Sequence, residues 1–478
     1  MRGFRLLAFA SAFIVAFAFA FVLFGFAAVA GEVKVGTDAR KGLSVAIYNG
    51  NLALVKDTRA IRLASGINDI AFVDVSAQIQ PETALLQGKG FVVLEQDFNF
   101  DLLSPSSLLD KYVGRGIKVI TTNPANGVEK TENAVVLSNN GGTVLKIGNR
   151  IETDFKGRLV FPDIPDNLRD RPTLVIKTNA KSSGNTDVQL AYLTSGLSWA
   201  ADYVAELDND EKFMSLNGWV TLTNTSGVAY ENANLQLVAG DVNRVQREMA
   251  SARMMKANAM DFVAAASTGM REESFMDYHL YSLDRKTSIL ANQTKQVALL
   301  ASPRVAVEKN YRIDNLFHLY PNMQKSDYQP RNPGVILKFF NSDVSGLGIP
   351  LPAGVFRVYK ADSKGQVLFV GEDRIRHTPK REEVKIKMGQ AFDVTAKVKI
   401  TDFKKLSDKA YQAEITIVFS NAKDSDVSVA YYQDLPIGYR IISESITSKK
   451  EGANQLLWNV FVPRNSDKVL KLEIFVAG

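Results

Sequence analysis

Apolar and polar residues alternate one by one along much of this chain, and this period restricts the possible folds more than any other feature of the sequence. In the stretch 394–401, for example, Val394, Ala396, Val398 and Ile400 are each followed by threonine or lysine. Successive side chains of a β-strand point to opposite faces of the sheet, so the pattern predicts strands with one buried and one solvated face. The same alternation returns in three later stretches: 413–419, 456–462 and 470–476.

Turn-forming residues separate these stretches, for instance at 420–425 and 449–454. Two-faced strands at this spacing predict an antiparallel, immunoglobulin-like β-sandwich over residues 391–478. Trp199, Trp219 and Trp458 all lie inside strand patterns. We therefore expect these indoles to be core side chains rather than platforms for sugars.

The first part of the chain follows the same period and predicts an N-terminal β unit over 31–100. Leu43, Val45 and Ile47 alternate with smaller or polar residues, and Asn49-Gly50 then separates them from the next apolar run. An Asn-Gly pair between two apolar strands is a strong signal for a β-hairpin, because both residues tolerate positive φ.

A different pattern begins at Ser104-Pro105, which is typical of a helix start, with Gly114 as the expected stop. Several short apolar stretches follow within about sixty residues, which indicates a small barrel. We therefore predict an SH3-like or Sm-like β-barrel insert over 101–180. A fold of this kind does not by itself specify a ligand.

A central β region is predicted over 181–390, interrupted at 243–277. That interruption contains six of the ten methionines and no proline. Two interpretations stay open: a mobile excursion between strands, or a helix or lid that docks on a partner through adaptable methionines.

The N-terminal residues 1–30 predict export. Arg2 and Arg5 precede an apolar run that ends in Ala28-Val29-Ala30, which is typical of a signal peptide cleaved after Ala30. The run is long enough to span a bilayer, so an uncleaved anchor is the alternative, and only then would the protein contact the membrane. Either interpretation places the body of the protein outside the cytoplasm: in the periplasm, at the outer envelope or secreted.

Composition narrows the possible chemistry. The chain has no cysteine, so neither disulfides nor thiolate catalysis is available, and its net charge of +6 is spread along the sequence rather than concentrated. A nucleic-acid-binding protein would show a concentrated basic face, and we expect no nucleic-acid partner. The three histidines are His279, His318 and His377, too far apart in sequence to suggest a metal site, and we expect no metal and no cofactor.

The densest group of catalytic residue types is Glu372, Asp373, Arg374 and His377. These side chains could act as acid, base and anion clamp. No second catalytic motif accompanies them, so we favour an alternative in which they form ion pairs and hydrogen bonds that close a strand connection.

Several blocks resemble a family of uncharacterised exported bacterial proteins. They read LSVAIYNGNLALVKDTR at 43–59, GLSWAADYVAEL at 196–207, LNGWVTLTNTSGVAYENANLQLVAGDVNRV at 216–245, LPAGVFRVYKAD at 351–362, FVGEDRIRHTPKREEVKIKMGQAFDV at 369–394 and LPIGYRI at 435–441. This is the domain of unknown function 4139 family, which is distantly related to the mucoidy-inhibitor-like proteins. The resemblance implies a secreted or envelope β protein and brings no catalytic residues with it. Those distant relatives carry a coiled-coil helical pair where this chain has the barrel-like insert.

Together these observations predict a mainly β, multi-domain scaffold outside the cytoplasm, with no enzymatic activity of its own. Its expected partner is an envelope protein or a surface polymer. The alternative is a carboxylate-dependent hydrolase or carbohydrate-active enzyme, which would need facing carboxylates.

Overall fold

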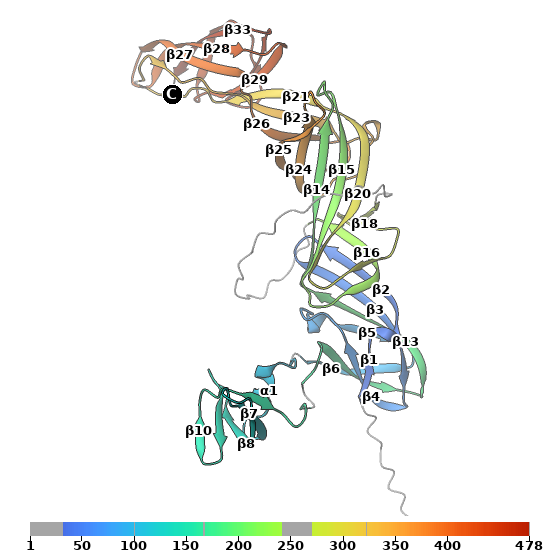
Figure 1. Ribbon diagram of the computed structural model, residues 1–478. Helices are drawn as coiled ribbons and strands as arrows, with labels where there is room; N and C mark the ends of the chain where they lie inside the picture. The colour runs from blue at the N-terminus through green and yellow to red at the C-terminus, as the bar shows by residue number, and fades with distance from the viewer. Residues whose placement is uncertain (1–31, 100, 166–167, 241–269, 322, 478) are drawn as a thin grey trace, which may run out of the picture.

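The computed structural model describes residues 32–99, 101–165, 168–240, 270–321 and 323–477. Across these residues the regular structure is almost entirely β, arranged in six sheets, which confirms the predicted mainly β class. The molecule is elongated, with the strands nearest the C-terminus at one end and a small separate sheet near the other (Figure 1). The predicted signal peptide, residues 1–30, lies outside the described residues.

Two sheets pack together in the N-terminal part. One has the order β1-β4-β12-β6 and the other the order β17-β18-β16-β2-β3-β13-β5, with β19 also paired to β16. The strands of the first are β1 (Val33–Val35), β4 (Gly66–Val73), β12 (Thr173–Ala180) and β6 (Phe91–Asn99). Those of the second are β17 (Arg271–Phe275), β18 (Tyr278–Ser282), β16 (Tyr230–Ala239), β2 (Arg40–Tyr48), β3 (Leu52–Leu63), β13 (Gly184–Thr194), β5 (Leu85–Gly88) and β19 (Thr287–Ile289).

The predicted hairpin at Asn49-Gly50 is present between β2 and β3, which pair in antiparallel. The residue that takes the positive φ is Asn51, at 52°. Short 3-10 helices η1 (Thr37–Ala39) and η2 (Pro81–Thr83) complete this part of the chain.

The insert between β6 and β12 forms a sheet of its own. It begins with the only α-helix of the described residues, α1 (Pro105–Lys111), where Ser104 and Ser107 form the N-terminal capping box. A five-stranded sheet of order β10-β9-β8-β7-β11 follows. Its strands are β7 (Gly116–Thr122), β8 (Glu129–Ser138), β9 (Val144–Ile147), β10 (Arg150–Glu152) and β11 (Arg158–Val160).

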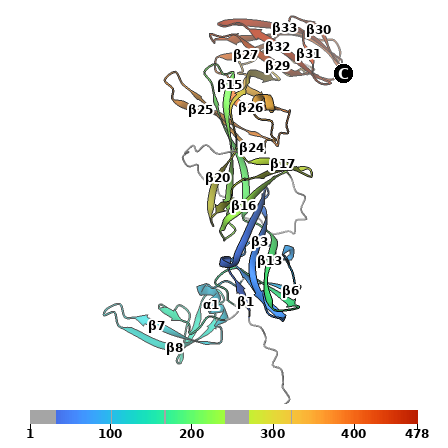
Figure 2. The same ribbon diagram turned by 90° about the vertical axis from the view of Figure 1, so that its right-hand side faces the viewer.

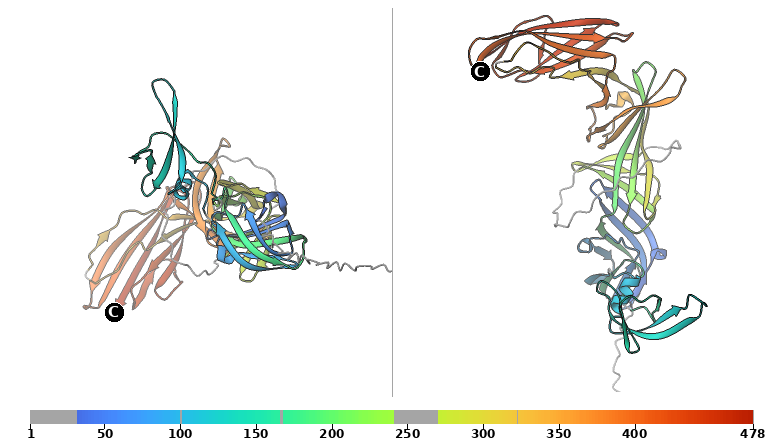
Figure 3. Two further views of the ribbon diagram at one scale, coloured as in Figure 1. Left: turned by 90° about the horizontal axis from the view of Figure 1, so that it is seen from below. Right: turned by 60° about the vertical axis from the view of Figure 1, so that its left-hand side comes forward.

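This insert has its own core, separate from the core of the neighbouring sheets. The segments through which the chain enters and leaves the insert are hydrogen-bonded to each other. The backbone N–H of Leu103 donates to the carbonyl oxygen of Arg169, and the backbone N–H of Arg169 donates to the carbonyl oxygen of Asp101. Figures 1 and 3 show the small sheet standing off the side of the molecule. Within the range predicted for the insert, β12 belongs instead to the N-terminal sheets.

The middle of the molecule is a sheet of order β20-β15-β14-β24-β25. Its strands are β20 (Gln293–Ala306), β15 (Phe213–Asn224), β14 (Leu197–Leu207), β24 (Gly354–Ala361) and β25 (Val367–Ile375). Its buried side chains join those of the N-terminal sheets in one continuous core, which includes Trp199. The β24–β25 hairpin is attached through a parallel pairing of β24 with β14.

Two further sheets form the C-terminal sandwich, seen edge-on in Figure 2. One has the order β26-β23-β21-β29-β32-β31 and the other β22-β27-β28-β33-β30. Their strands are β26 (Glu383–Gln390), β23 (Gly334–Phe340), β21 (Glu308–Asp314), β29 (Val427–Asp434), β32 (Gln455–Val462), β31 (Lys449–Lys450), β22 (Ser326–Asp327), β27 (Val394–Lys405), β28 (Ala410–Asn421), β33 (Ser466–Ala477) and β30 (Tyr439–Glu444). The turn η3 (Asp343–Ser345) follows β23.

The sandwich therefore extends beyond the range 391–478, since β21, β22, β23 and β26 all precede residue 391. Leu337 and Phe339 of β23 belong to the core shared with the central sheet, whereas Tyr311 and Ile313 of β21 belong to the C-terminal core. The sheet that contains β21 and β23 thus contributes side chains both to the core shared with the central sheet and to the C-terminal core.

The Met-rich interruption predicted at 243–277 lies mostly outside the described residues. Its last part is described, and there the chain forms a strand rather than the helix that one interpretation predicted. Arg271–Phe275 is strand β17, which pairs with β18, and Met270 is buried. Among the described residues no helix is both long and apolar enough to cross a bilayer.

Candidate functional site

The four residues singled out from the sequence lie at the end of the edge strand β25 and just after it. Glu372 and Asp373 are neighbours on a regularly paired part of the strand, so their side chains point to opposite faces of the sheet. Glu372 pairs with Arg357, with 3.2 Å between its Oε2 and the arginine Nε, and Arg357 also pairs with Asp202 at 2.9 Å. The two carboxylates therefore do not face each other across a common site.

Asp373 and His377 make contacts that hold separate segments of the chain together. The Asp373 carboxylate accepts backbone N–H bonds from Arg374 and Lys387, both at 2.8 Å, and the second bond ties β25 to β26. Nδ1 of His377 accepts the backbone N–H of Ala353 at 3.2 Å. Arg374 is exposed. Glu372, Asp373 and His377 thus make structural contacts, each to a different neighbour.

Replacing Asp373 by alanine should therefore destabilise the protein modestly. We expect a loss of about 1–2 kcal/mol in the free energy of unfolding, because two backbone N–H groups lose their acceptor. Urea unfolding followed by circular dichroism measures this loss. Asp408→Ala is the control, since its pair with Lys405 lies on the surface with Asp408 97% exposed. Equal effects of the two substitutions would contradict the proposed tie between β25 and β26.

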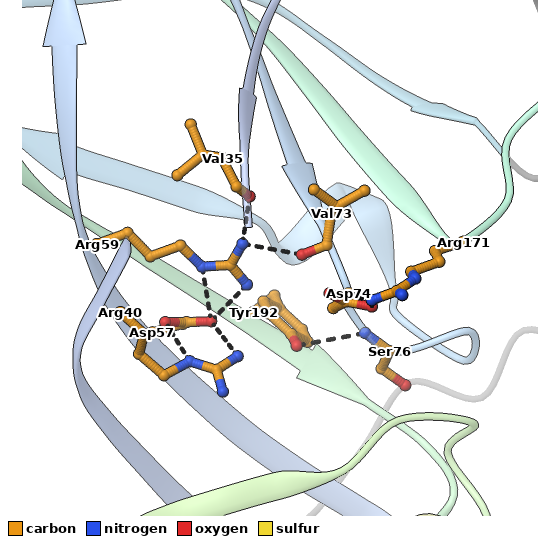
Figure 4. A network of polar contacts seen from close by, with 9 residues as sticks. All are labelled: Val35, Arg40, Asp57, Arg59, Val73, Asp74, Ser76, Arg171 and Tyr192. Atoms are coloured by element: carbon orange, nitrogen blue, oxygen red, sulfur yellow. Dashed lines mark hydrogen bonds and ion pairs between the residues drawn. The ribbon is translucent and has the colours of Figure 1, made fainter. Parts of the chain in front are cut away.

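The most deeply buried charges lie elsewhere, between the two N-terminal sheets (Figure 4). The Asp57 carboxylate accepts two bonds from Arg59, at 3.1 and 2.8 Å, and two from Arg40, at 3.1 and 2.9 Å. Arg59 also donates through Nη1 to the carbonyl oxygens of Val35 at 2.6 Å and Val73 at 2.9 Å. Its side chain is fully buried, and that of Asp57 is 4% exposed.

This network joins the two sheets. Asp57 and Arg59 belong to β3, whereas Val35 and Val73 belong to β1 and β4 of the facing sheet. Three of these four bonds reach Oδ2 and one reaches Oδ1, so two guanidinium groups take most of the acceptor capacity of this carboxylate. This network was not predicted from the sequence. Its signal was the strand period, which places Asp57 and Arg59 on the same face as Val55 and Ile61.

A polar cleft of about 480 Å³ lies next to this network. Its arginines are engaged by carboxylates: Arg171 binds Asp74 at 3.0 Å, as drawn in Figure 4, and Arg169 binds Glu32 at 2.5 Å. The hydrogen bond from Arg169 holds the pKa of Glu32 below its usual value. These pairs attach the segment that returns from the insert to the N-terminal sheets.

Two surface features take no part in these contacts. The first half of β25 exposes four consecutive apolar side chains: Val367 (54%), Leu368 (55%), Phe369 (56%) and Val370 (44%). The second feature is a hollow of about 530 Å³ on the sheet of the insert. In the described residues, no three metal-binding side chains are grouped closely enough to hold an ion.

Comparison with known proteins adds no relative. No protein-family model matches the chain, and no curated protein matches it.

Proposed function

We propose that this chain is an exported, non-enzymatic β scaffold that binds another protein, and that β25 is the binding edge. The observation that carries the proposal is the run of exposed apolar side chains at Val367–Val370. An exposed apolar edge strand presents unpaired backbone groups and apolar side chains, which is the arrangement used when a partner adds a strand to a sheet.

The position of β25 supports this interpretation. It is the last strand of the central sheet, so the ladder continues on one side only. Its second half is anchored, because Asp373 accepts the backbone N–H of Lys387 in β26. The first half extends beyond this anchor. Figure 2 shows the β25 ribbon projecting from the body of the molecule.

A protein fits this edge better than a polysaccharide does. Aliphatic side chains such as Val367 and Leu368 offer no hydrogen bonds to sugar hydroxyls. The one aromatic ring of this run, that of Phe369, packs edge-on against Tyr359, with 5.6 Å between the ring centres. An extended polypeptide, by contrast, supplies both backbone partners and apolar side chains.

Localisation outside the cytoplasm forms part of the proposal and rests on the N-terminal sequence. Arg2, Arg5 and the apolar run that ends at Ala30 favour export. The sequence blocks that resemble the domain of unknown function 4139 family imply the same localisation, although no protein-family model matches the chain.

Photo-crosslinking in the native envelope tests the binding edge. A photoreactive amino acid is placed at Leu368, and in a separate protein at Val344, an apolar residue of η3 that is fully exposed. We expect a discrete cross-linked product with a second polypeptide from position 368 and none from position 344. Adding Val367→Glu should reduce the product by about tenfold or more, because a carboxylate would be buried in the interface.

Two outcomes would contradict this assignment. Equal cross-linking from both positions would mean that β25 has no special affinity. A product made of two copies of this chain would mean that the edge serves self-association instead of binding another protein. Val344→Glu is the matched charge control and should leave the product from position 368 unchanged.

A further inference from the structure

The hollow on the insert lies on the outer face of its sheet. Ile117, Val119, Val136 and Leu145 point to the other face and form the core of the insert. The residues between them face outward, and the strand register places them side by side. Gly116 lies opposite Val135, and Val135 lies opposite Lys146. In the next row, Lys118 lies opposite both Asn133 and Val160.

Gly116 creates the floor of this hollow. Its φ lies outside the left-handed region, so the backbone does not require glycine there. A Cβ atom at this position would meet nothing closer than the Ala134 carbonyl oxygen at 3.9 Å, so packing does not require glycine either. The missing side chain leaves the floor open.

The wall of the hollow is held in place before any ligand binds. Val160, Phe161 and Pro162 line it. The ring of Phe161 packs edge-on against the buried Tyr112, with 5.0 Å between ring centres. The Tyr112 hydroxyl donates to the backbone carbonyl of Asp163 at 2.9 Å and also contacts its carboxylate. A preformed apolar wall of this kind lowers the entropy cost of binding.

The charge of the hollow is positive. Lys118 and Lys146 line it, and neither forms an ion pair with any described residue. The nearby carboxylates are already occupied by other cations. Glu132 pairs with Arg150 at 3.2 Å, and Glu129 pairs with Arg158 at 2.5 Å. The two lysines are therefore available to an external carboxylate.

We propose that this hollow binds an extended segment of a partner polypeptide in which an acidic side chain stands next to an apolar one. The apolar side chain would rest over Gly116 against Val160, and the carboxylate would lie between Lys118 and Lys146. The hollow is not enclosed, which suits an extended backbone better than a lipid tail. Its volume of about 530 Å³ accommodates a few side chains. This second site has a different chemistry from the apolar edge β25.

Selection from a random heptapeptide library displayed on phage tests this site. The purified protein, expressed from its full sequence, serves as bait. We expect enrichment of peptides that carry Asp or Glu beside Leu, Ile or Phe. The dissociation constant of an enriched peptide, synthesised and titrated by fluorescence anisotropy, should rise about tenfold or more in Gly116→Leu, which fills the floor. Lys118→Glu with Lys146→Glu should weaken binding by a similar factor and reduce its salt dependence.

Matched variants distinguish filling the hollow from disturbing the fold. Gly184→Leu adds the same side chain at another strand glycine with no atom within 4 Å of its Cβ, and Lys399→Glu reverses an exposed charge on β27. Both should bind the peptide like the unmodified protein, as should Leu368→Glu on β25. Enrichment without acidic residues, or unchanged affinity in Gly116→Leu, would overturn the proposal. Leu368→Glu alters only β25. A negative result for the hollow would therefore not count against binding at β25.

Discussion

Replacing Asp57 by alanine is expected to lower the free energy of unfolding by about 3–5 kcal/mol. The change removes the acceptor of four hydrogen bonds from Arg40 and Arg59. Arg59 would remain between the two N-terminal sheets with its side chain fully buried and no counter-charge. Breaking a buried ion pair on one side costs more than the pair contributes, because the remaining charge stays out of water. Urea unfolding, with hydrogen exchange of peptides from β3 and β4, measures the loss and locates it.

An exposed ion pair on the same sheet serves as the control, because it shows how much stability is lost when a paired carboxylate is removed without burial. Asp187 pairs with Lys41 at 3.0 Å, but both side chains are more than half exposed. Asp187→Ala should therefore cost less than about 1 kcal/mol. The double variant Asp57→Leu with Arg59→Met should be more stable than Asp57→Ala, because it leaves only the partly exposed Arg40 without a partner. If Asp57→Ala proved as mild as Asp187→Ala, the network would not be a clamp between the sheets.

The sequence predicted those parts of the fold that depend on neighbouring residues. The alternation at 394–401 became β27, with Val394, Ala396, Val398 and Ile400 buried. Ser104-Pro105 became the start of α1, because capping needs only the first turn of the helix. Such signals are local, so one chain suffices to recognise them.

The choice of strand partners could not be predicted in the same way. β2 pairs in parallel with β16, and Ser44 lies opposite Asn234. β21 likewise pairs in parallel with β29, which draws residues before 391 into the C-terminal sandwich. The period of a strand fixes which face is buried but not which strand lies beside it. Contacts between segments this far apart in sequence are decided by the packing of the whole core.

In the candidate sites, too, local signals could be recognised in the sequence and long-range packing could not. Glu372 and Asp373 are of residue types that suggested catalysis. Their adjacent positions in a strand, however, already implied that their side chains point to opposite faces of the sheet. The period also placed Asp57 and Arg59 on the buried face of β3, a signal that was present but not used. Gly116 gave no signal at all, because a hollow depends on what the neighbouring strands place around it. Residue type therefore predicts chemistry only when the direction of the side chain is considered with it.

Trp458 offers the largest test of the C-terminal core. The indole is fully buried and lies nearly parallel to the ring of Tyr431, with 5.3 Å between ring centres and 23° between ring planes. Its Nε1 donates to Glu444 Oε2 at 3.0 Å. Trp458→Ala should lower the free energy of unfolding by about 3–5 kcal/mol, because a large cavity remains and Glu444 loses a donor. Hydrogen exchange should show the loss of protection in β29, β32 and β33.

Phe461 is the matched control for this substitution, because it lies on the same strand with its ring on the opposite, outer face and is 56% exposed. Phe461→Ala should change the free energy of unfolding by about 0.5 kcal/mol or less. A similar large loss in both variants would mean that the outer face of β32 is also packed. If Trp458→Ala instead left stability unchanged and abolished binding of a polysaccharide, the indole would be a ligand platform. The stacking on Tyr431 and the bond to Glu444 both argue for the core, because each uses a surface of the indole that a sugar would need.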